Sequence, residues 1–258
     1  MSTTTKPTIL LVHGAWHGSW CWKFQIPMLE ALGYSVETVD LPCTSKVPGT
    51  TQSDDAAQVR SSVESLLSKG KSVIVLAHSY GGSIASAGMR GLSGEHNGML
   101  LGLIALCAVM HPGGYDQGEF IRNAGSLPFV VSWDSPVEGL CVVKDPASLF
   151  YTPDVPADRI KWALPQVRPH SMAASMDIVP PQVWQDDHYT GQLGYIRCTA
   201  DVSIPIERQD SIIEAAGGQE RWVIRTLEGS GHSPFLSCPD QVATAIDEIV
   251  KEFEAKLK

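Results

Sequence analysis

The stretch SVIVLAHSYGG, which runs from Ser72 to Gly82, joins an apolar run to a serine in a glycine-rich turn. After Ser72, the five residues Val73 to Ala77 are all apolar, and such a run is typical of a strand buried on both faces. Ser79 has Ala77 two residues before it and Gly81 two residues after it, and small residues there let a strand and a helix approach around a strained turn. The usual pattern has glycine where Ala77 stands. The stretch predicts a nucleophile elbow centred on Ser79; a serine that only caps a helix is the alternative.

Further strand-like runs lie on both sides of this elbow, over 7–13, 35–41, 100–109, 194–199 and 222–227. Helices are predicted between them where apolar residues fall at helical spacing, as in Val59, Val63, Leu66 and Leu67 after a cap at Ser53, and in a closing helix after Pro239. Alternating strands and helices specify a doubly wound, mostly parallel α/β sheet.

The residues 111–190 break this alternation, because they are rich in proline and scattered aromatic residues and contain no strand run of comparable strength. So long a segment is too much for a simple loop in a compact domain. We therefore expect residues 1–110 and 191–258 to form the core and residues 111–190 to form a mainly helical cap inserted over the carboxyl ends of the strands.

Length and composition fit one soluble domain. The 258 residues are 43% hydrophobic, and the net charge is −9 with a pI near 5.3. Such a balance makes nucleic acid and anionic membranes poor partners and favours a small, neutral substrate. No secretory leader and no apolar run of about 18 residues is evident, so we expect a cytoplasmic protein. We expect it to be a monomer or a homodimer. The six cysteines are dispersed singly, which favours reduced, mostly buried thiols over a zinc site.

A serine nucleophile needs a base, and the base needs an orienting acid. His232 lies in GSGHSP directly after the last predicted strand, the position that the order serine, acid, histidine requires. Asp201 follows the preceding strand and is the expected acid. The end of the strand before that carries no carboxylate, and Asp116 already falls in the cap. The alternatives are an exposed loop histidine at 232 and a turn-forming aspartate at 201.

Acyl transfer also requires N–H donors for the negative charge on the carbonyl oxygen. The candidates are the backbone N–H groups of Tyr80, at the start of the helix after the nucleophile, and Ala15, in the loop after the first strand. His13 and His17 have a spacing found in metal ligands, but no HExxH glutamate accompanies them. We expect neither a metal nor a cofactor.

Four aromatic residues are candidates for the wall of an apolar substrate pocket: Trp16, Phe129, Trp133 and Trp162. Simple packing inside the cap explains each of them equally well.

Three motifs can be compared with known families: the segment LVHGAWHGSWCW (11–22), the elbow and the Gly231-His232-Ser233 loop. With them the chain resembles one branch of the α/β-hydrolase superfamily. That branch holds plant methylesterases, methylketone synthases, hydroxynitrile lyases and their microbial relatives. The resemblance covers nearly the whole chain outside the cap. It implies an α/β-hydrolase fold with Ser79, Asp201 and His232 as triad and Ala15 and Tyr80 as oxyanion donors. Hydroxynitrile lyases of this branch carry a threonine and a lysine where this chain has Gly14 and Ser233, so the resemblance speaks against cyanohydrin chemistry.

These observations predict a serine esterase or lactonase that acts through an acyl-enzyme. One alternative is a lyase, decarboxylase, cyclase or cofactor-free oxygenase that uses the histidine without acylation. Another is a ligand-binding receptor built on the same scaffold.

Overall fold

The computed structural model describes residues 6–92, 98–119, 131–132, 137–186 and 192–256, with side chains for all of these except 131–132. Its main sheet has six parallel strands in the order β2-β1-β3-β4-β8-β9. The strands are β1 (Thr8–Val12), β2 (Ser35–Val39), β3 (Ser72–His78), β4 (Met99–Leu106), β8 (Gln192–Cys198) and β9 (Val223–Leu227). All six predicted strands are present, and the predicted doubly wound architecture is confirmed.

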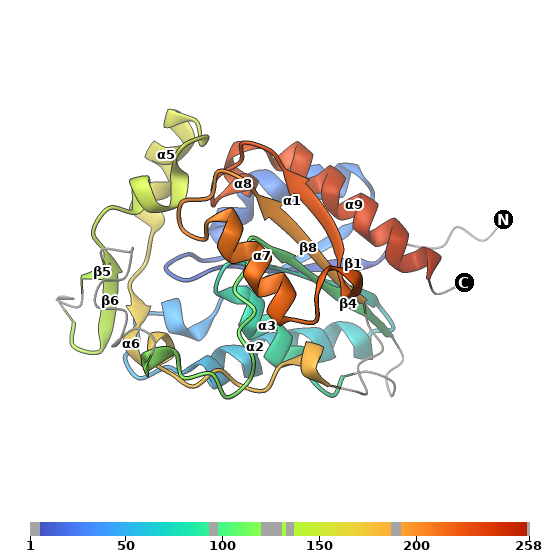
Figure 1. Cartoon of the computed structure of the whole chain (residues 1–258), viewed down its shortest axis with the longest axis horizontal. Coiled ribbons are helices and arrows are strands. Elements are labelled where there is room, and N and C mark those ends of the chain that lie inside the picture. The colour runs from blue at the N-terminus through green and yellow to red at the C-terminus, as the bar shows by residue number, and fades with distance from the viewer. Residues whose placement is uncertain (1–5, 93–97, 120–130, 133–136, 187–191, 257–258) are drawn as a thin grey trace.

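Helices cover both faces of this sheet (Figure 1). The α-helices of the core are α1 (Gln25–Ala31), α2 (Gln52–Ser68), α3 (Gly81–Met89), α7 (Ile206–Ala215), α8 (Pro234–Ser237) and α9 (Pro239–Ala255). Short 3-10 turns are η1 (Ser19–Phe24), η2 (Pro42–Thr44) and η6 (Gln219–Arg221).

Alternate residues of β1 belong to two separate cores. Leu10 and Val12 pack in the cluster that includes α2 and α3, whereas Ile9 and Leu11 pack in the cluster that includes α1 and α9. Successive side chains of a strand point to opposite faces, so a strand covered by helices on both sides must be apolar throughout. That is why the sequence shows continuous apolar runs here.

Helix α2 begins two residues earlier than the sequence suggested. Its N-cap is Thr51, whose hydroxyl accepts from the backbone N–H of Asp54 while the Asp54 carboxylate accepts from the backbone N–H of Thr51. This reciprocal capping box satisfies two donors that a helix start leaves unpaired. The expected cap, Ser53, lies inside the first turn instead.

Where the structure describes it, the segment between β4 and β8 holds the short elements β5 (Val131–Ser132), β6 (Leu140–Val143), the π-helical turn η3 (Ala147–Tyr151), α5 (Ala157–Ala163), η4 (Leu164–Gln166), β7 (His170–Ser171), α6 (Met172–Ser175) and η5 (Val183–Gln185). Besides the expected helices, β5, β6 and β7 form a small sheet whose neighbouring strands pair antiparallel. Strands of two to four residues are too short to show alternation in a sequence. The exact cap limits, 111–190, stay a prediction.

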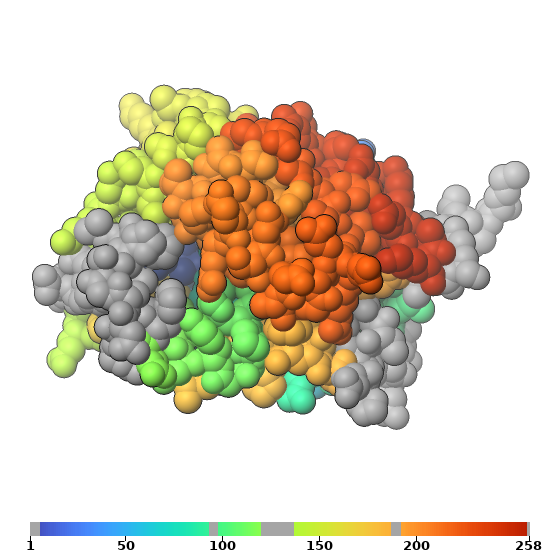
Figure 2. Space-filling model, in the orientation of Figure 1, coloured from blue at the N-terminus to red at the C-terminus, as the bar shows by residue number. Residues whose placement is uncertain are grey.

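In Figure 1 the elements α5, β6 and α6 of the insertion lie at the left end of the molecule, and the C-terminal helix α9 runs toward the right end. The space-filling view shows a small area of the blue N-terminal segment at the bottom of a hollow between the yellow-green insertion and the orange C-terminal part (Figure 2). Within the described chain, no helix is long and apolar enough to cross a membrane. Five of the six cysteines are buried, as predicted.

Candidate active site

Ser79 occupies the predicted elbow between β3 and α3. Its backbone φ is 53°, in the left-handed region that non-glycine residues adopt rarely and usually at functional turns. The turn tolerates no larger neighbour, because a β carbon at Gly81 would lie 2.6 Å from the carbonyl oxygen of His13. Ala77 is fully buried and fits where glycine is usual. The local packing explains why the sequence needs small residues around the serine.

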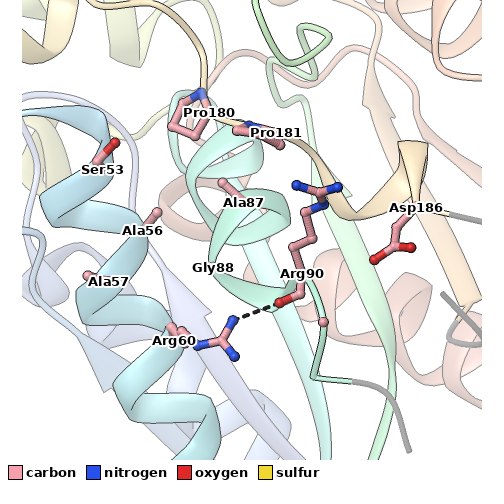
Figure 3. Close-up of a pocket in the computed structure, with 11 residues that line it drawn as sticks. Ser53, Ala56, Ala57, Arg60, Ala87, Gly88, Arg90, Pro180, Pro181 and Asp186 are labelled. Carbon is pink, nitrogen blue, oxygen red and sulfur yellow. Dashed lines mark hydrogen bonds between the residues drawn. The ribbon is translucent and has the colours of Figure 1, made fainter. Parts of the chain in front are cut away.

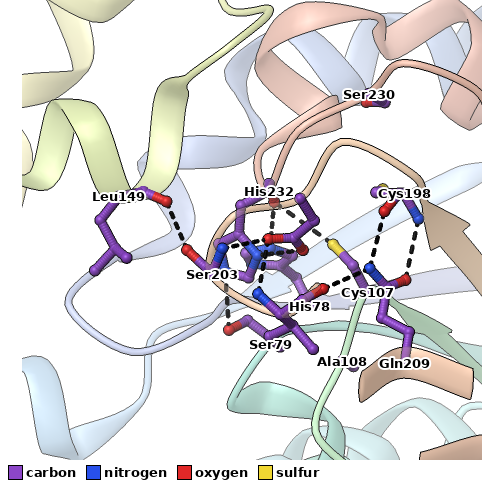
Figure 4. A network of polar contacts seen from close by, with 12 residues as sticks. His78, Ser79, Cys107, Ala108, Leu149, Cys198, Ser203, Gln209, Ser230 and His232 are labelled. Atoms are coloured by element: carbon purple, nitrogen blue, oxygen red, sulfur yellow. Dashed lines mark hydrogen bonds and ion pairs between the residues drawn. The ribbon is translucent and has the colours of Figure 1, made fainter. Parts of the chain in front are cut away.

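The three predicted triad residues come from three separate loops and meet at this turn. His232 lies in the loop after β9, and its Nε2 is 3.1 Å from Ser79 Oγ. Its Nδ1 is 2.8 Å from Oδ2 of Asp201, which follows β8. The other carboxylate oxygen of Asp201 accepts from the backbone N–H groups of Ser203 and Ile204 at 2.7 and 2.8 Å. Figure 4 shows this network.

Burial strengthens these contacts. His232 is 2% exposed and Asp201 is 4% exposed, so water competes little for their hydrogen bonds. With Nδ1–H donated to the carboxylate, Nε2 is left as an acceptor facing the Ser79 hydroxyl. This is the tautomer that a general base for serine requires.

Two residues that the sequence analysis did not single out hold the backbone of His232. The Nε2–H of His78 donates to the His232 carbonyl at 2.8 Å, and the Cys107 thiol points at the same oxygen at 3.5 Å. Burial lowers the pKa of His78 well below its usual value, so its ring stays neutral. These partners are 154 and 125 positions away from His232, and no local pattern reveals them.

The predicted oxyanion donors lie on the two expected elements. Tyr80 is the N-cap residue of α3, and Ala15 lies in the loop after β1. Among the residues that the structure describes, neither backbone N–H has a hydrogen-bond partner. The Tyr80 side chain has a separate partner, because its hydroxyl donates to the buried Asp55 carboxylate at 2.7 Å.

The predicted pocket residues differ in their surroundings. Trp16 lies 5.9 Å from Phe150 between ring centroids, and the Phe150 ring in turn lies 6.0 Å from the His232 imidazole. Trp162 packs instead against Trp20 and Phe24, at 5.7 and 5.3 Å. Phe129 and Trp133 lie outside the described residues. Phe150 is therefore the aromatic neighbour of the histidine that the sequence analysis missed.

The ring nitrogens of His13 and His17 are already engaged with the protein. His13 accepts from the Leu41 N–H at 3.0 Å and donates to the Gly14 carbonyl at 2.8 Å. His17 bonds to the Ala15 carbonyl at 2.9 Å and to another side chain through Nε2. Burial lowers their pKa values to about 4 and about 3. These contacts give both histidines a structural role and argue against their use as metal ligands.

A separate surface hollow of about 620 Å³ lies beside α2 and α3 (Figure 3). Its lining consists of small residues of the two helices, the two prolines Pro180 and Pro181, Asp186, and the side chains of Arg60 and Arg90. It includes none of the predicted triad or oxyanion residues.

A parallel sheet that carries a serine on a strained turn after β3, a carboxylate after β8 and a histidine after β9 defines the class of this molecule: it has the α/β-hydrolase fold. Comparison with known proteins agrees. The model of the alpha/beta hydrolase family matches residues 9–245. The chain belongs to this family.

Several relatives match almost end to end. A probable hydrolase of the fungus Phoma is 27% identical, over 95% of this chain and 98% of the relative. Methylesterase 1 of Arabidopsis thaliana is 24% identical over 96% and 97%, and a norfluorocurarine synthase from Strychnos is 23% identical over 96% and 97%. These relatives support a hydrolase and also include a protein named as a synthase.

Solved structures share the fold. A methylesterase from Arabidopsis superimposes with a TM-score of 0.73 at 21% identity, over 95% of this chain and 99% of that one. Tomato methylketone synthase I in complex with 2-tridecanone gives 0.75 at 21%, over 96% and 99%. Together with the family match and the relatives named above, one of them a methylesterase, they bear out the resemblance to this branch of the superfamily that the sequence motifs indicated.

Proposed function

We propose that this protein is a serine hydrolase that cleaves an ester or lactone of a small, largely apolar substrate through an acyl-enzyme. The observation that carries the proposal is the continuous hydrogen-bonded chain from Ser79 Oγ through the His232 imidazole to Asp201, with contacts of 3.1 and 2.8 Å. Hydroxyl, base and orienting acid in this order make up the arrangement that activates serine for attack on a carbonyl.

In this proposal the Ser79 hydroxyl gives its proton to His232 Nε2 as Oγ bonds to the substrate carbonyl carbon. Asp201 remains ionised and stabilises the imidazolium through Nδ1–H. The N–H groups of Ala15 and Tyr80 stabilise the oxyanion. His232 then returns the proton to the leaving alkoxide, the acyl-enzyme forms, and a water molecule activated by the same imidazole releases the acid.

The surroundings of the histidine support an apolar substrate. The Trp16 ring packs against the Phe150 ring, and the Phe150 ring packs against the His232 imidazole, so apolar groups cover one side of the imidazole. The net charge of −9 disfavours polyanionic substrates. The proposed chemistry calls for no metal or cofactor.

The test is labelling with a fluorophosphonate probe, read by intact mass, because it detects an activated serine whatever the substrate is. We expect a single adduct on the wild-type protein and none on Ser79→Ala or His232→Ala. Ser211→Ala is the matched control, since Ser211 is an exposed serine on α7 whose hydroxyl donates to the Glu207 carbonyl. A folded wild type that takes up no probe would contradict the proposal.

Some of the similar proteins are named as synthases, and this favours a second candidate function. In it His232 moves protons without an acyl-enzyme, as in a lyase, decarboxylase or cyclase. The same variants separate the two functions. Turnover of a substrate that survives Ser79→Ala but not His232→Ala would support acid–base chemistry, whereas hydrolysis through Ser79 loses nearly all turnover in both variants.

A further inference from the structure

One short segment of the insertion contacts three loops of the proposed site: those that carry Asp201, His232 and Ala15. It runs from Leu149 to Asp154, beginning within the π-helical turn η3, and is called the clasp segment here. The first contact is with the acid loop, where the Ser203 hydroxyl donates to the Leu149 carbonyl. Because the backbone N–H of Ser203 also donates to Asp201, this contact ties the clasp segment to the carboxylate.

The second contact is with the loop that carries His232. The Ser230 hydroxyl donates to Asp154 Oδ2 at 3.2 Å. At Gly231 the clasp segment comes so close that a β carbon would lie 2.6 Å from the Thr152 carbonyl oxygen and 2.7 Å from Asp154 Oδ1. The backbone directly before the histidine is therefore packed against the clasp segment.

The third contact is with the loop of the proposed oxyanion donor Ala15. The Tyr151 hydroxyl lies 3.2 Å from His17 Nε2, and the opposite nitrogen of that ring bonds to the Ala15 carbonyl at 2.9 Å. Burial raises the pKa of Tyr151 and lowers that of His17, so a protonated hydroxyl faces a neutral ring and the two can form one donor–acceptor pair.

Phe150 lies at the centre of these contacts and is 3% exposed. Its ring is inclined by 30° to the His232 imidazole at a centroid distance of 6.0 Å. On its other sides it meets His17 at 5.1 Å and Trp16 at 5.9 Å. Rings held at such distances in a packed interior restrict one another's rotation.

We propose that Phe150 is a positioning residue of the site: held by the clasp segment, it fixes the plane of the His232 imidazole between Ser79 and Asp201. The inference rests on the proposed function. It gives the insertion a part in orienting the proposed general base. π-helical turns occur often at functional sites, and η3 fits that pattern.

The geometry has a direct consequence for rate. His232 must take a proton from Ser79 and deliver it to the leaving group without losing its bond to Asp201, so small errors in ring orientation reduce turnover. Misplacement of a reacting group by about 1 Å can cost on the order of 100-fold. Without the Phe150 ring, the imidazole gains space on one side.

The experiment compares Phe150→Ala, Phe150→Leu and Tyr151→Phe with the wild type. The matched control is Phe24→Leu, since Phe24 packs against the same hydrophobic cluster but has its ring contact with Trp162. Three measurements are made: the rate of fluorophosphonate labelling, the steady-state kinetics (kcat and KM) with a p-nitrophenyl ester, and the proton NMR signal of His232 Nδ1–H in the resting protein.

We expect Phe150→Ala to lower the labelling rate and kcat by at least about tenfold with a much smaller change in KM, the signature of lost transition-state interactions. The Nδ1–H signal should broaden or shift. Phe150→Leu, which keeps much of the side-chain volume, should label faster than Phe150→Ala. The labelling rate of Tyr151→Phe should lie between those of Phe150→Ala and the wild type. Phe24→Leu should label at the wild-type rate.

Equal labelling rates for Phe150→Ala and Phe24→Leu, or a loss confined to KM with an unchanged Nδ1–H signal, would overturn the inference. If Phe150→Ala does not fold, Phe150→Leu and Tyr151→Phe decide by the same criteria. A wild type that does not label would contradict the proposed function instead, and the NMR comparison then still tests whether Phe150 orients His232.

Discussion

Gly14 and Ser79 are in such close contact that a β carbon on Gly14 would lie 2.9 Å from the β carbon of Ser79. The same atom would be 3.0 Å from Nδ1 of His78. The loop after β1 therefore lies directly against the nucleophile turn, with the proposed oxyanion donor Ala15 as the next residue. Only glycine allows this approach.

Gly14→Ala should accordingly lower kcat by about 100-fold or more, since the clash displaces either the serine or the neighbouring donor. The measurement is steady-state hydrolysis of a p-nitrophenyl ester. Gly91→Ala is the control: an added β carbon there meets nothing within 4 Å, although φ is +71°. It should cost about 1 kcal/mol of stability and leave kcat unchanged. Equal kcat values for the two variants would contradict the close contact at Gly14.

Asp201→Asn should lower kcat on the order of 10⁴-fold, with little change in KM, because the amide would stabilise the wrong tautomer of His232. Asp210→Asn is the matched control, since Asp210 forms a partly exposed ion pair with Arg197. Full activity of Asp201→Asn in a folded protein would remove Asp201 from the proposed triad.

Tyr80→Phe should lower the free energy of unfolding by about 1 to 3 kcal/mol, because the fully buried Asp55 carboxylate would lose a hydrogen bond that water cannot replace. Tyr34→Phe provides the comparison. Tyr34 also donates to an aspartate, Asp247, but that carboxylate keeps two lysine partners and should tolerate the loss better. Urea unfolding measures both, and a larger loss for Tyr34→Phe would contradict this reasoning.

Acid should destabilise the protein below about pH 6.5. Burial lowers the pKa of His13 and His170 to about 4 and that of His17 to about 3, and lowers the pKa of His78 as well. Between about pH 6.5 and pH 4 these histidines bind protons in the unfolded chain but not in the folded one, so the free energy of unfolding falls as the pH falls. Each contributes about 1.4 kcal/mol per pH unit.

Urea unfolding between pH 7 and pH 4.5 checks this linkage. In His170→Gln the dependence on pH should be shallower by about one proton, because one buried neutral histidine is gone. Identical pH slopes for the variant and the wild type would show that His170 titrates alike in the folded and unfolded states.

The sequence predicted those parts of the fold that depend on neighbouring residues. Continuous apolar runs marked the six strands of the main sheet, because strands covered on both faces are apolar at every position. Small residues around Ser79 marked the elbow. Since the carboxyl ends of parallel strands share one edge of a sheet, the predicted positions of the strands along the chain were also enough to propose Asp201 and His232 as partners of the serine.

What the sequence determined was therefore local: the main-sheet strands, the nucleophile turn and the loops that carry the other two residues. The tertiary structure alone decided the rest: Phe150 against the imidazole, His78 beneath the His232 carbonyl, and the small sheet of the insertion. The reason is physical. These features depend on contacts between segments far apart in the chain, and on strands too short to leave a period, so no pattern of neighbouring residues encodes them.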